Sequence, residues 1–401
     1  MLFLIAVPLW LFGVIFPPTV ESESLVLVQF AAFAWFPIAA VFSSRGRFLF
    51  GPAFREQPWT VALAGASIVA ITASAALSED PTLSLGFVAT VAIGLVCCAG
   101  VWEMGREKIA TSLWVYSVLG TALIGYVYWV GARVQGRLTI GDAHPNYLGL
   151  ISFGFLMCAP ALPKRGIAAI LIAANLYIIV ETQSRSALAA SILGLFVFAS
   201  LKAKQMKKGR AAFTLACVAL LSTVLLLVYY DTIETWVSSL FFLNDRYRGL
   251  GTGFTGRIDA WQEALDLFQQ NPLFGVGFRM HERYMTTLSS AHNGYLSLLA
   301  EVGIFGTIPL IGLAILGGYR LFRRAWSGDE MAIMGFAFFA GYALLVVFER
   351  LFLNMGNPTS ILAWIFLMIG APRSAAARTP LQSVAKVQGR YENAQALRGA
   401  F

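Results

Sequence analysis

Charge is scarce in this 401-residue chain. Charged residues make up 12% of the sequence, whereas hydrophobic residues make up 58%. Ordinary soluble domains carry about 25% charged residues, so the composition excludes a typical soluble fold. The chain is therefore expected to be an integral membrane protein.

Cysteine is also rare, with four residues in the chain. All four fall inside apolar runs, where a thiol acts as a small apolar side chain: Cys97, Cys98, Cys158 and Cys217. A disulfide framework is therefore not expected.

Apolar runs long enough to cross a hydrocarbon core of ~30 Å recur along the sequence. About twelve transmembrane helices are predicted, at 2–16, 25–43, 59–78, 83–101, 110–131, 147–162, 167–182, 186–201, 212–230, 295–318, 331–349 and 359–371. The first run lacks the basic start and the cleavage site of a signal peptide, so we expect it to be retained. The predicted fold class is all-α, a polytopic membrane protein.

One long polar stretch interrupts these runs and divides the chain into four parts. They are helices one to nine (1–230), a polar loop with an amphipathic helix (231–294), helices ten to twelve (295–371) and a basic tail (372–401). A polar insert between apolar spans is where chemistry can reach water.

Lysine and arginine gather in every second connection between the predicted spans. The members are Arg45, Arg47, Arg55, Arg106, Lys108, Lys164, Arg165, Lys202, Lys204, Lys207, Lys208, Arg210, Arg320, Arg323, Arg324 and the tail from Arg373. Such loops are typically cytoplasmic, which places both termini inside and the 231–294 loop outside. The net charge of +8 then reflects topology, and binding to nucleic acid is not expected.

Several arginines break this rule because they fall on the predicted outer side. They are Arg133, Arg137, Arg185, Arg246, Arg248, Arg257, Arg279 and Arg283. Arginine suits phosphate because its planar fork donates two hydrogen bonds to one anion. The alternative is that they anchor lipid headgroups or form a solvated face. Arg185 favours a functional role, because the Thr182–Ser186 connection is so short that its side chain must stay at the membrane surface, where the serines could cap the next helix.

An amphipathic helix is predicted within the polar loop, lying on the membrane or on the other spans. Ile258, Trp261, Leu265 and Phe268 recur at helical spacing, and Asn271-Pro272 ends the pattern. Arg257 falls in its first turn after a glycine-rich run, so its guanidinium and the free backbone N–H groups would face the same anion.

Two histidines on the outer side are candidate site residues. His292 and Asn293 begin the span that follows the polar loop, where the helix dipole favours a neutral imidazole that can accept a proton. The alternative is a capping or interfacial histidine. For His144 and Asn146, ligand contact and a role in holding the loop before the sixth span both stay open. Glu301, inside a predicted span, should face the protein interior and form hydrogen bonds there.

Taken together, a series of short motifs resembles the O-antigen ligase superfamily of bacterial membrane glycosyltransferases. The motifs are His144-Pro-Asn146, Ser184-Arg185, Gly256-Arg257 with Trp261, Gly275-Val-Gly277, and His292-Asn293-Gly-Tyr295 with Glu301, Gly303 and Gly306. The resemblance covers 144–306.

The resemblance implies transfer of a glycan from undecaprenyl diphosphate to an acceptor hydroxyl at the periplasmic face of the bacterial inner membrane. In the ligase branch the acceptor is a lipid A–core sugar, and the product is lipopolysaccharide. It also implies that Arg185 and Arg257 match two essential arginines and His292 an essential histidine, with Arg137 and His144 as further matches. His144, Asn146 and Asn293 are possible loop or acceptor contacts.

The implied chemistry needs positive charge rather than a pair of carboxylates, because a diphosphate leaves as an anion without taking a proton. His292 would take the proton of the acceptor hydroxyl, and the sugar would be inverted. Neither a metal nor a cofactor is expected, since the outer loops lack an Asp-x-Asp motif. The alternative metal ligands are Glu21, Glu23, Glu79 and Asp80, which are also typical of solvated loops.

Three other functions stay open. An O-antigen polymerase and a protein O-oligosaccharyltransferase belong to the same superfamily, although the latter usually resembles a longer chain. A transporter or lipid-carrier flippase would also suit about twelve spans. Transporters tend to carry polar sites at mid-membrane in repeated halves, whereas polar residues here gather on one outer face.

Overall fold

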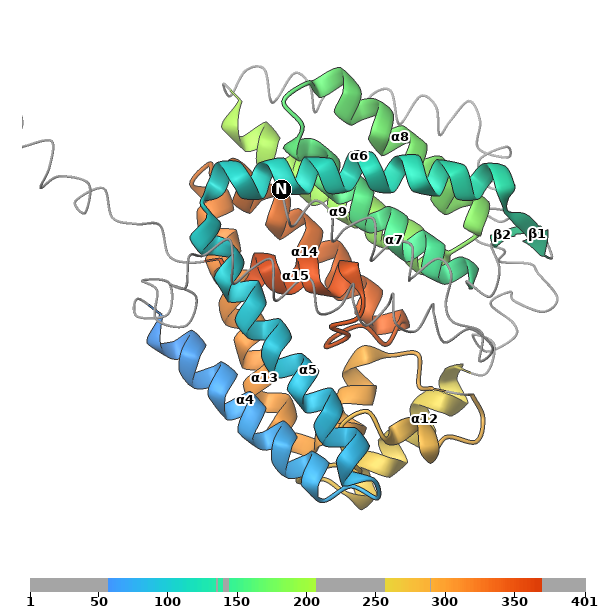
Figure 1. Cartoon of the computed structure of the whole chain (residues 1–401), viewed down its shortest axis with the longest axis vertical. Coiled ribbons are helices and arrows are strands. Elements are labelled where there is room, and N and C mark those ends of the chain that lie inside the picture. The colour runs from blue at the N-terminus through green and yellow to red at the C-terminus, as the bar shows by residue number, and fades with distance from the viewer. Residues whose placement is uncertain (1–56, 135, 140–143, 207–256, 289, 370–401) are drawn as a thin grey trace, which may run out of the picture. The chain divides into compact units, whose positions relative to one another are not determined.

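The structure is a computed structural model that describes residues 57–134, 136–139, 144–206, 257–288 and 290–369. Its elements are shown in Figure 1. The α-helices are α4 (Pro58–Ala76), α5 (Pro81–Gly100), α6 (Arg106–Val130), α7 (Pro145–Cys158), α8 (Arg165–Thr182), α9 (Arg185–Gln205), α12 (Arg257–Gln270), α13 (Gly294–Trp326), α14 (Glu330–Phe348) and α15 (Pro358–Leu367). Short 3₁₀ helices are η1 (Val101–Met104), η2 (Ala159–Ala161) and η4 (His281–Arg283), and the strands are β1 (Ala132–Val134) and β2 (Arg137–Thr139).

Only some of the predicted membrane-spanning helices are confirmed in the described part of the chain. Seven helices there are long and apolar enough to cross a membrane: α4, α5, α6, α8, α9, α13 and α14. The predicted spans 147–162 and 359–371 coincide with α7 and α15, which have only 14 and 10 residues and are too short to cross alone. The predicted spans 2–16, 25–43 and 212–230, loop residues 231–256 and the tail lie outside the described residues. Cys97, Cys98 and Cys158 are buried free thiols, as expected, and Cys217 lies outside the described residues.

The described residues are mostly helical, as predicted, and they also contain one small antiparallel hairpin. β1 pairs with β2 so that Arg133 lies opposite Leu138. The turn contains Gly136 with φ +76°, a backbone conformation that glycine adopts without steric cost. All three residues of β2 are buried, so the hairpin turns Arg137 toward the protein interior.

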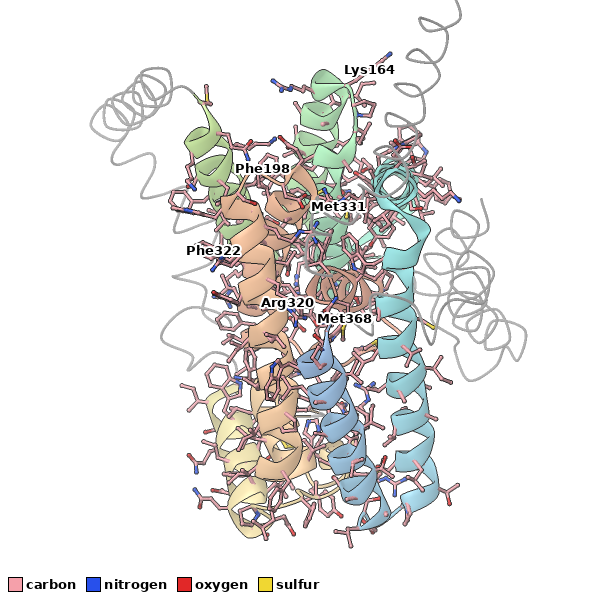
Figure 2. The ribbon with its side chains drawn as sticks, turned by 90° about the vertical axis from the view of Figure 1, so that its left-hand side faces the viewer. Lys164, Phe198, Arg320, Phe322, Met331 and Met368 are labelled. Atoms are coloured by element: carbon pink, nitrogen blue, oxygen red, sulfur yellow. The ribbon has the colours of Figure 1, made fainter. Side chains whose placement is uncertain are left out.

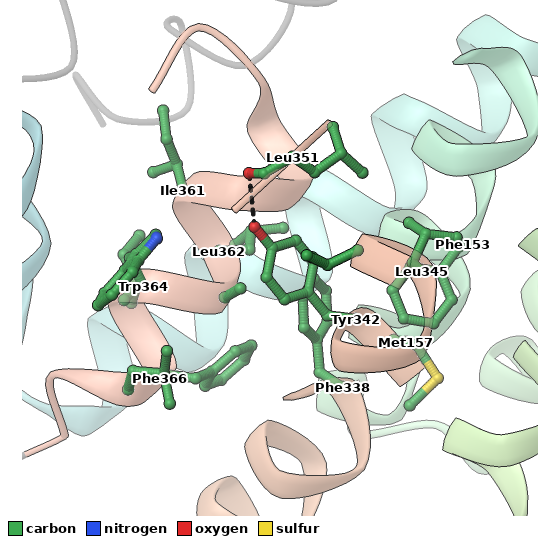
Figure 3. Close-up of a cluster of buried hydrophobic side chains, with 14 of the residues drawn as sticks. Phe153, Met157, Phe338, Tyr342, Leu345, Leu351, Ile361, Leu362, Trp364 and Phe366 are labelled. Atoms are coloured by element: carbon green, nitrogen blue, oxygen red, sulfur yellow. Dashed lines mark hydrogen bonds between the residues drawn. The ribbon is translucent and has the colours of Figure 1, made fainter. Parts of the chain in front are cut away.

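The core lies where α7, α14 and α15 meet. Figure 3 shows Phe153, Phe338, Tyr342 and Trp364 among its side chains. The aromatic polar atoms are satisfied by backbone, because the Tyr342 hydroxyl donates to the Leu351 carbonyl at 2.7 Å and the Trp364 Nε1–H donates to the Phe352 carbonyl at 2.7 Å. These bonds tie the connection between α14 and α15 to the core.

Contacts between helix ends separate the connections into two groups. At one end, Arg106 pairs with Asp329 and Lys202 pairs with Glu330. The same group includes the start of α4, where Gln57 and Thr60 accept hydrogen bonds from Arg320 of α13. Arg320 is labelled in Figure 2. The other group joins the described residues of the connections at 77–80, 131–139, 183–184, 257–293 and 349–357, which carry most of the predicted site residues. This grouping is the one that the alternating lysine and arginine pattern predicts.

Helix α13 is broken at Gly303, and the loop that follows α12 fills the break. Gly303 has φ +57° and ψ −162°, so the helical hydrogen bonds are interrupted there. The Val276 N–H donates to the Ala300 carbonyl at 2.9 Å, and the Ile304 N–H donates to the Pro272 carbonyl at 2.9 Å. The loop therefore satisfies backbone groups that would otherwise be costly to leave unbonded in an apolar surrounding.

Gly275→Ala is expected to destabilise the protein by about 1–3 kcal/mol or more, because it overpacks this break. A Cβ there would lie 2.3 Å from the Glu301 carbonyl carbon, and φ is +68°. Gly86→Ala in α5 is the matched control, since no atom of the described residues lies within 4 Å of its Cβ position. The measurement is the melting temperature in detergent. Equal melting temperatures for Gly275→Ala and wild type would contradict the packing of the loop into α13.

Candidate functional site

The carboxylate of Glu349, directly after α14, is the point where four helices meet. The Asn146 Nδ2 of α7 donates to Glu349 Oε1 at 3.3 Å, and the Ser186 hydroxyl of α9 also donates to this carboxylate. Arg257, the first residue of α12, places Nη2 3.8 Å from Glu349 Oε1. The two side chains of this ion pair are 18% and 16% exposed, so the site is half-enclosed rather than sealed.

Arg137 reaches the same cluster from the hairpin. Its side chain is 7% exposed, its Nε donates to the Thr182 carbonyl at 3.0 Å, and its Nη2 donates to Asn146 Oδ1. The Asn146 amide therefore bridges Arg137 and Glu349. Two of the predicted site residues are thus in direct contact, and a third, Arg257, lies beside the same carboxylate.

Burial and nearby positive charge shift the pKa of Glu349 in opposite directions. Burial raises the pKa of this carboxyl to about 6, although Arg257, Asn146, Ser186 and Arg137 all act to lower it. Part of the Glu349 population is therefore protonated just below neutral pH.

The turn that holds His292 lies against this cluster. A Cβ at Gly294 would be 2.7 Å from Val346 Cγ1 and 3.2 Å from the Glu349 carbonyl oxygen, so the chain approaches the end of α14 closely there. The half-buried His292 has φ +46°, and its N–H donates to Ser290 Oγ at 3.1 Å. Burial lowers the pKa of His292, and the charge of Arg257 lowers it further. These two effects favour the neutral imidazole at pH 7.

Backbone strain is concentrated in the connections that form the site. Among the described residues, the non-glycine residues with positive φ are Gln183, Arg279 and His292. Such conformations cost about 1–3 kcal/mol each and cluster at functional sites. Gln183 directly precedes Ser184 and Arg185, and its Nε2 donates to the Gly136 carbonyl at 3.2 Å.

Arg185 is the first residue of α9 and is half-buried, one position before Ser186. The predicted break between α8 and α9 is confirmed. The suggested serine cap is wrong for Ser184: it lies at the N-cap position, but within the described residues its side chain caps no backbone N–H. Its hydroxyl instead lies 3.4 Å from the Ser186 hydroxyl.

His144 and Asn293 both cap helices. His144 Nδ1 accepts the Asn146 N–H at 3.2 Å at the start of α7. Asn293 Oδ1 accepts the Tyr295 N–H at 3.0 Å and the Leu296 N–H at 3.1 Å at the start of α13. These contacts support the alternative in which the two side chains hold local structure.

A second buried cluster surrounds Glu301, which is 3% exposed and faces the interior as predicted. His281 Nδ1 lies 2.6 Å from Glu301 Oε1, and Arg350 Nη2 lies 2.5 Å from the same oxygen. Arg350 also pairs with Glu282. This network ties the loop before α13 to the connection after α14, so it supports the two segments that carry His292 and Glu349.

The other outer arginines have partners within the described protein. Arg279 lies 5.3 Å from the Phe87 ring centroid, and Arg283 pairs with Asp80 at 2.9 Å. Arg133 pairs with Glu181 at 2.7 Å. Arg246 and Arg248 lie outside the described residues.

Helix α12 begins at Arg257 and ends at Gln270, as predicted, but it packs through a different face. The fully buried side chains are Ala260 and Ala264, which lie against α13. Small side chains let the two helices approach closely, whereas Ile258 is exposed and Trp261 is only half-buried. The predicted apolar stripe is thus at most half-buried against the described protein, and its contact with the membrane stays a prediction.

Within the described part of the chain, no group of three or more histidine, cysteine, aspartate or glutamate side chains could hold a metal ion. Asp80 accepts the Leu83 N–H at 3.1 Å as a helix cap and pairs with Arg283, and these contacts lower its pKa. Glu21 and Glu23 lie outside the described residues.

Residues 168–311 match the family model described as O-antigen ligase. The matched stretch contains Arg185, Arg257 and His292, whereas Arg137 and Glu349 lie outside it. The comparison with curated proteins gave no significant match.

Proposed function

Residues 168–311 belong to the O-antigen ligase superfamily, and on this premise we propose that the protein is an O-antigen ligase. It transfers a glycan from undecaprenyl diphosphate to a lipid A–core hydroxyl during lipopolysaccharide assembly. The observation that carries the proposal is the convergence of Arg137 and Arg257 on one half-enclosed site beside the His292 turn. We place this site at the periplasmic side of the inner membrane, where both lipid-linked substrates would be present.

The arginines hold the donor diphosphate in this proposal. Arg257 is the first described residue of α12, and its planar guanidinium can donate two hydrogen bonds to one anion. Arg185 starts α9 next to Ser186, which already reaches the site. Positive groups fixed at this position stabilise the charge that develops on the leaving diphosphate.

His292 acts as the general base. The acceptor oxygen attacks the anomeric carbon, the bond from that carbon to the diphosphate oxygen breaks, and the diphosphate leaves with the electron pair. His292 takes the hydroxyl proton, for which it must be neutral. The lowered pKa of His292 supports this role at pH 7. Attack opposite the leaving group inverts the sugar.

The proposal is tested by reconstituting the full-length protein with a purified lipid-linked O-antigen and lipid A–core. A ligase forms glycan-bearing lipopolysaccharide. In a deletion strain, lipopolysaccharide should lack the glycan while carrier-linked polymer persists. Loss of the polymer itself in that strain would favour a polymerase. Glycosylation of serine or threonine in a protein would favour an oligosaccharyltransferase. Movement of the carrier without a new glycosidic bond would favour a flippase.

Glycan transfer is expected to survive chelation of divalent metal. The arginines supply the positive charge that a divalent ion supplies in many diphosphate-using enzymes. The initial rate in the reconstituted assay should therefore be the same with excess EDTA as with added magnesium or manganese. A loss of activity in EDTA that one of these ions restores would contradict this expectation and direct attention to Glu21, Glu23, Glu79 and Asp80.

A further inference from the structure

We propose that Glu349 is an internal counter-anion, which occupies the arginine site until the donor diphosphate displaces it. The inference rests on the proposed function, since it assumes that the incoming anion is a diphosphate. It assigns a role to a carboxylate at the centre of the site, where the donor's own negative charge must be accommodated.

The carboxylates of Glu301 and Glu349 are held very differently. Glu301 lies 2.5 Å from Arg350 and 2.6 Å from His281, distances typical of strong charge-assisted hydrogen bonds. Glu349 lies 3.8 Å from Arg257 and 3.3 Å from the Asn146 donor. The Glu349–Arg257 pair is therefore loose, and another anion can replace the carboxylate beside Arg257 at modest cost.

Two guanidinium groups of the described residues act on the Glu349 carboxylate. Arg257 and Arg137 both lower the pKa of Glu349 through their positive charge. A diphosphate diester brings two negative charges and several oxygens that can accept bidentate bonds. The partial exposure of Arg257 and Glu349 leaves a path by which such an anion can enter.

Competition of this kind weakens donor binding in the wild type. The donor binds Arg257 fully only when the carboxylate has moved away or taken up a proton, so its apparent affinity is reduced by the fraction of protein in that state. The raised pKa of Glu349 supports the idea that this carboxyl gives up its charge readily. Neutral replacement of Glu349 should therefore strengthen binding, whereas loss of a purely structural residue would weaken it.

The test measures binding of a short-chain polyprenyl diphosphate carrying one sugar to the full-length protein in detergent. Glu349→Gln keeps the size and can accept the Asn146 and Ser186 hydrogen bonds, and its dissociation constant should fall by about tenfold. Glu349→Ala should also tighten binding, and Glu349→Asp, which keeps the charge, should not. Glu181→Gln is the matched control, since it releases Arg133 at the same end of the helices but away from Glu349.

Unchanged or weaker binding by the folded Gln and Ala variants would overturn the inference and make Glu349 a support for Arg257. Tighter binding by Glu181→Gln as well would also overturn it, because any released arginine would then have the same effect. If the wild type does not bind the probe and Arg257→Lys makes no difference, the proposed function fails instead. Melting temperatures recorded for each variant separate lost folding from lost binding.

Discussion

His292→Ala is expected to reduce glycan transfer by roughly 10²–10⁴-fold, the usual contribution of a general base. The half-buried imidazole lies at the turn before α13, and the helix itself is capped by Asn293, so the substitution leaves the helix start intact. The measurement is the initial rate of ligation with purified donor and acceptor. Donor binding and melting temperature should stay close to wild type.

His144→Asn is the matched control for this variant. Asparagine can also cap α7, so ligation should remain near the wild-type rate. Near-normal ligation by His292→Ala would rule out the base and leave His292 as an interfacial residue.

The pH dependence gives a second test of His292. Because a base must be neutral, activity should fall as the pH drops through the His292 pKa, which lies below its usual 6.5. Burial raises the pKa of Glu349 to about 6, so the profile should also be recorded in Glu349→Gln to separate the two groups. A rate that does not fall at any acid pH at which both proteins stay folded would contradict a histidine base.

Hydropathy and local signals predict where most of the described helices lie. The end of α12 before Asn271-Pro272 follows from local residue types, as does the start of α13 after Asn293. Glu301 was correctly placed in the interior, because a charge inside an apolar run is too costly to face lipid. These features depend on residues close together in the sequence.

The central carboxylate was missed because its partners are distant in the sequence. Glu349 was assigned as the last residue of a predicted span, and its contact with Asn146 joins positions 203 residues apart. Glu349 ends an apolar run, and a charged side chain there, like Glu301, is too costly to face lipid and needs a partner inside the protein. The hairpin was missed because three-residue strands have too little periodicity to be recognised, and only Gly136 marks their turn.

The identity of the cation at Arg257 is expected to matter as much as its charge. Arg257→Lys should reduce ligation by roughly 10²–10³-fold, the effect of removing an oriented donor from a developing anion. Lysine keeps the positive charge near Glu349, but a single ammonium cannot form two parallel hydrogen bonds to a diphosphate. The rate of ligation should fall and the donor dissociation constant should rise. Arg185→Lys should behave in the same way.

Arg283→Lys distinguishes the site arginines from ordinary surface arginines. Arg283 pairs with Asp80 and is 44% exposed, so the lysine variant should keep that pair and ligate normally. Both variants replace arginine with lysine, so a lower ligation rate in Arg257→Lys than in Arg283→Lys would be due to the lost planar guanidinium at Arg257. Wild-type turnover and donor affinity in Arg257→Lys and Arg185→Lys would show that charge alone suffices, and would reduce both arginines to anchors for lipid headgroups.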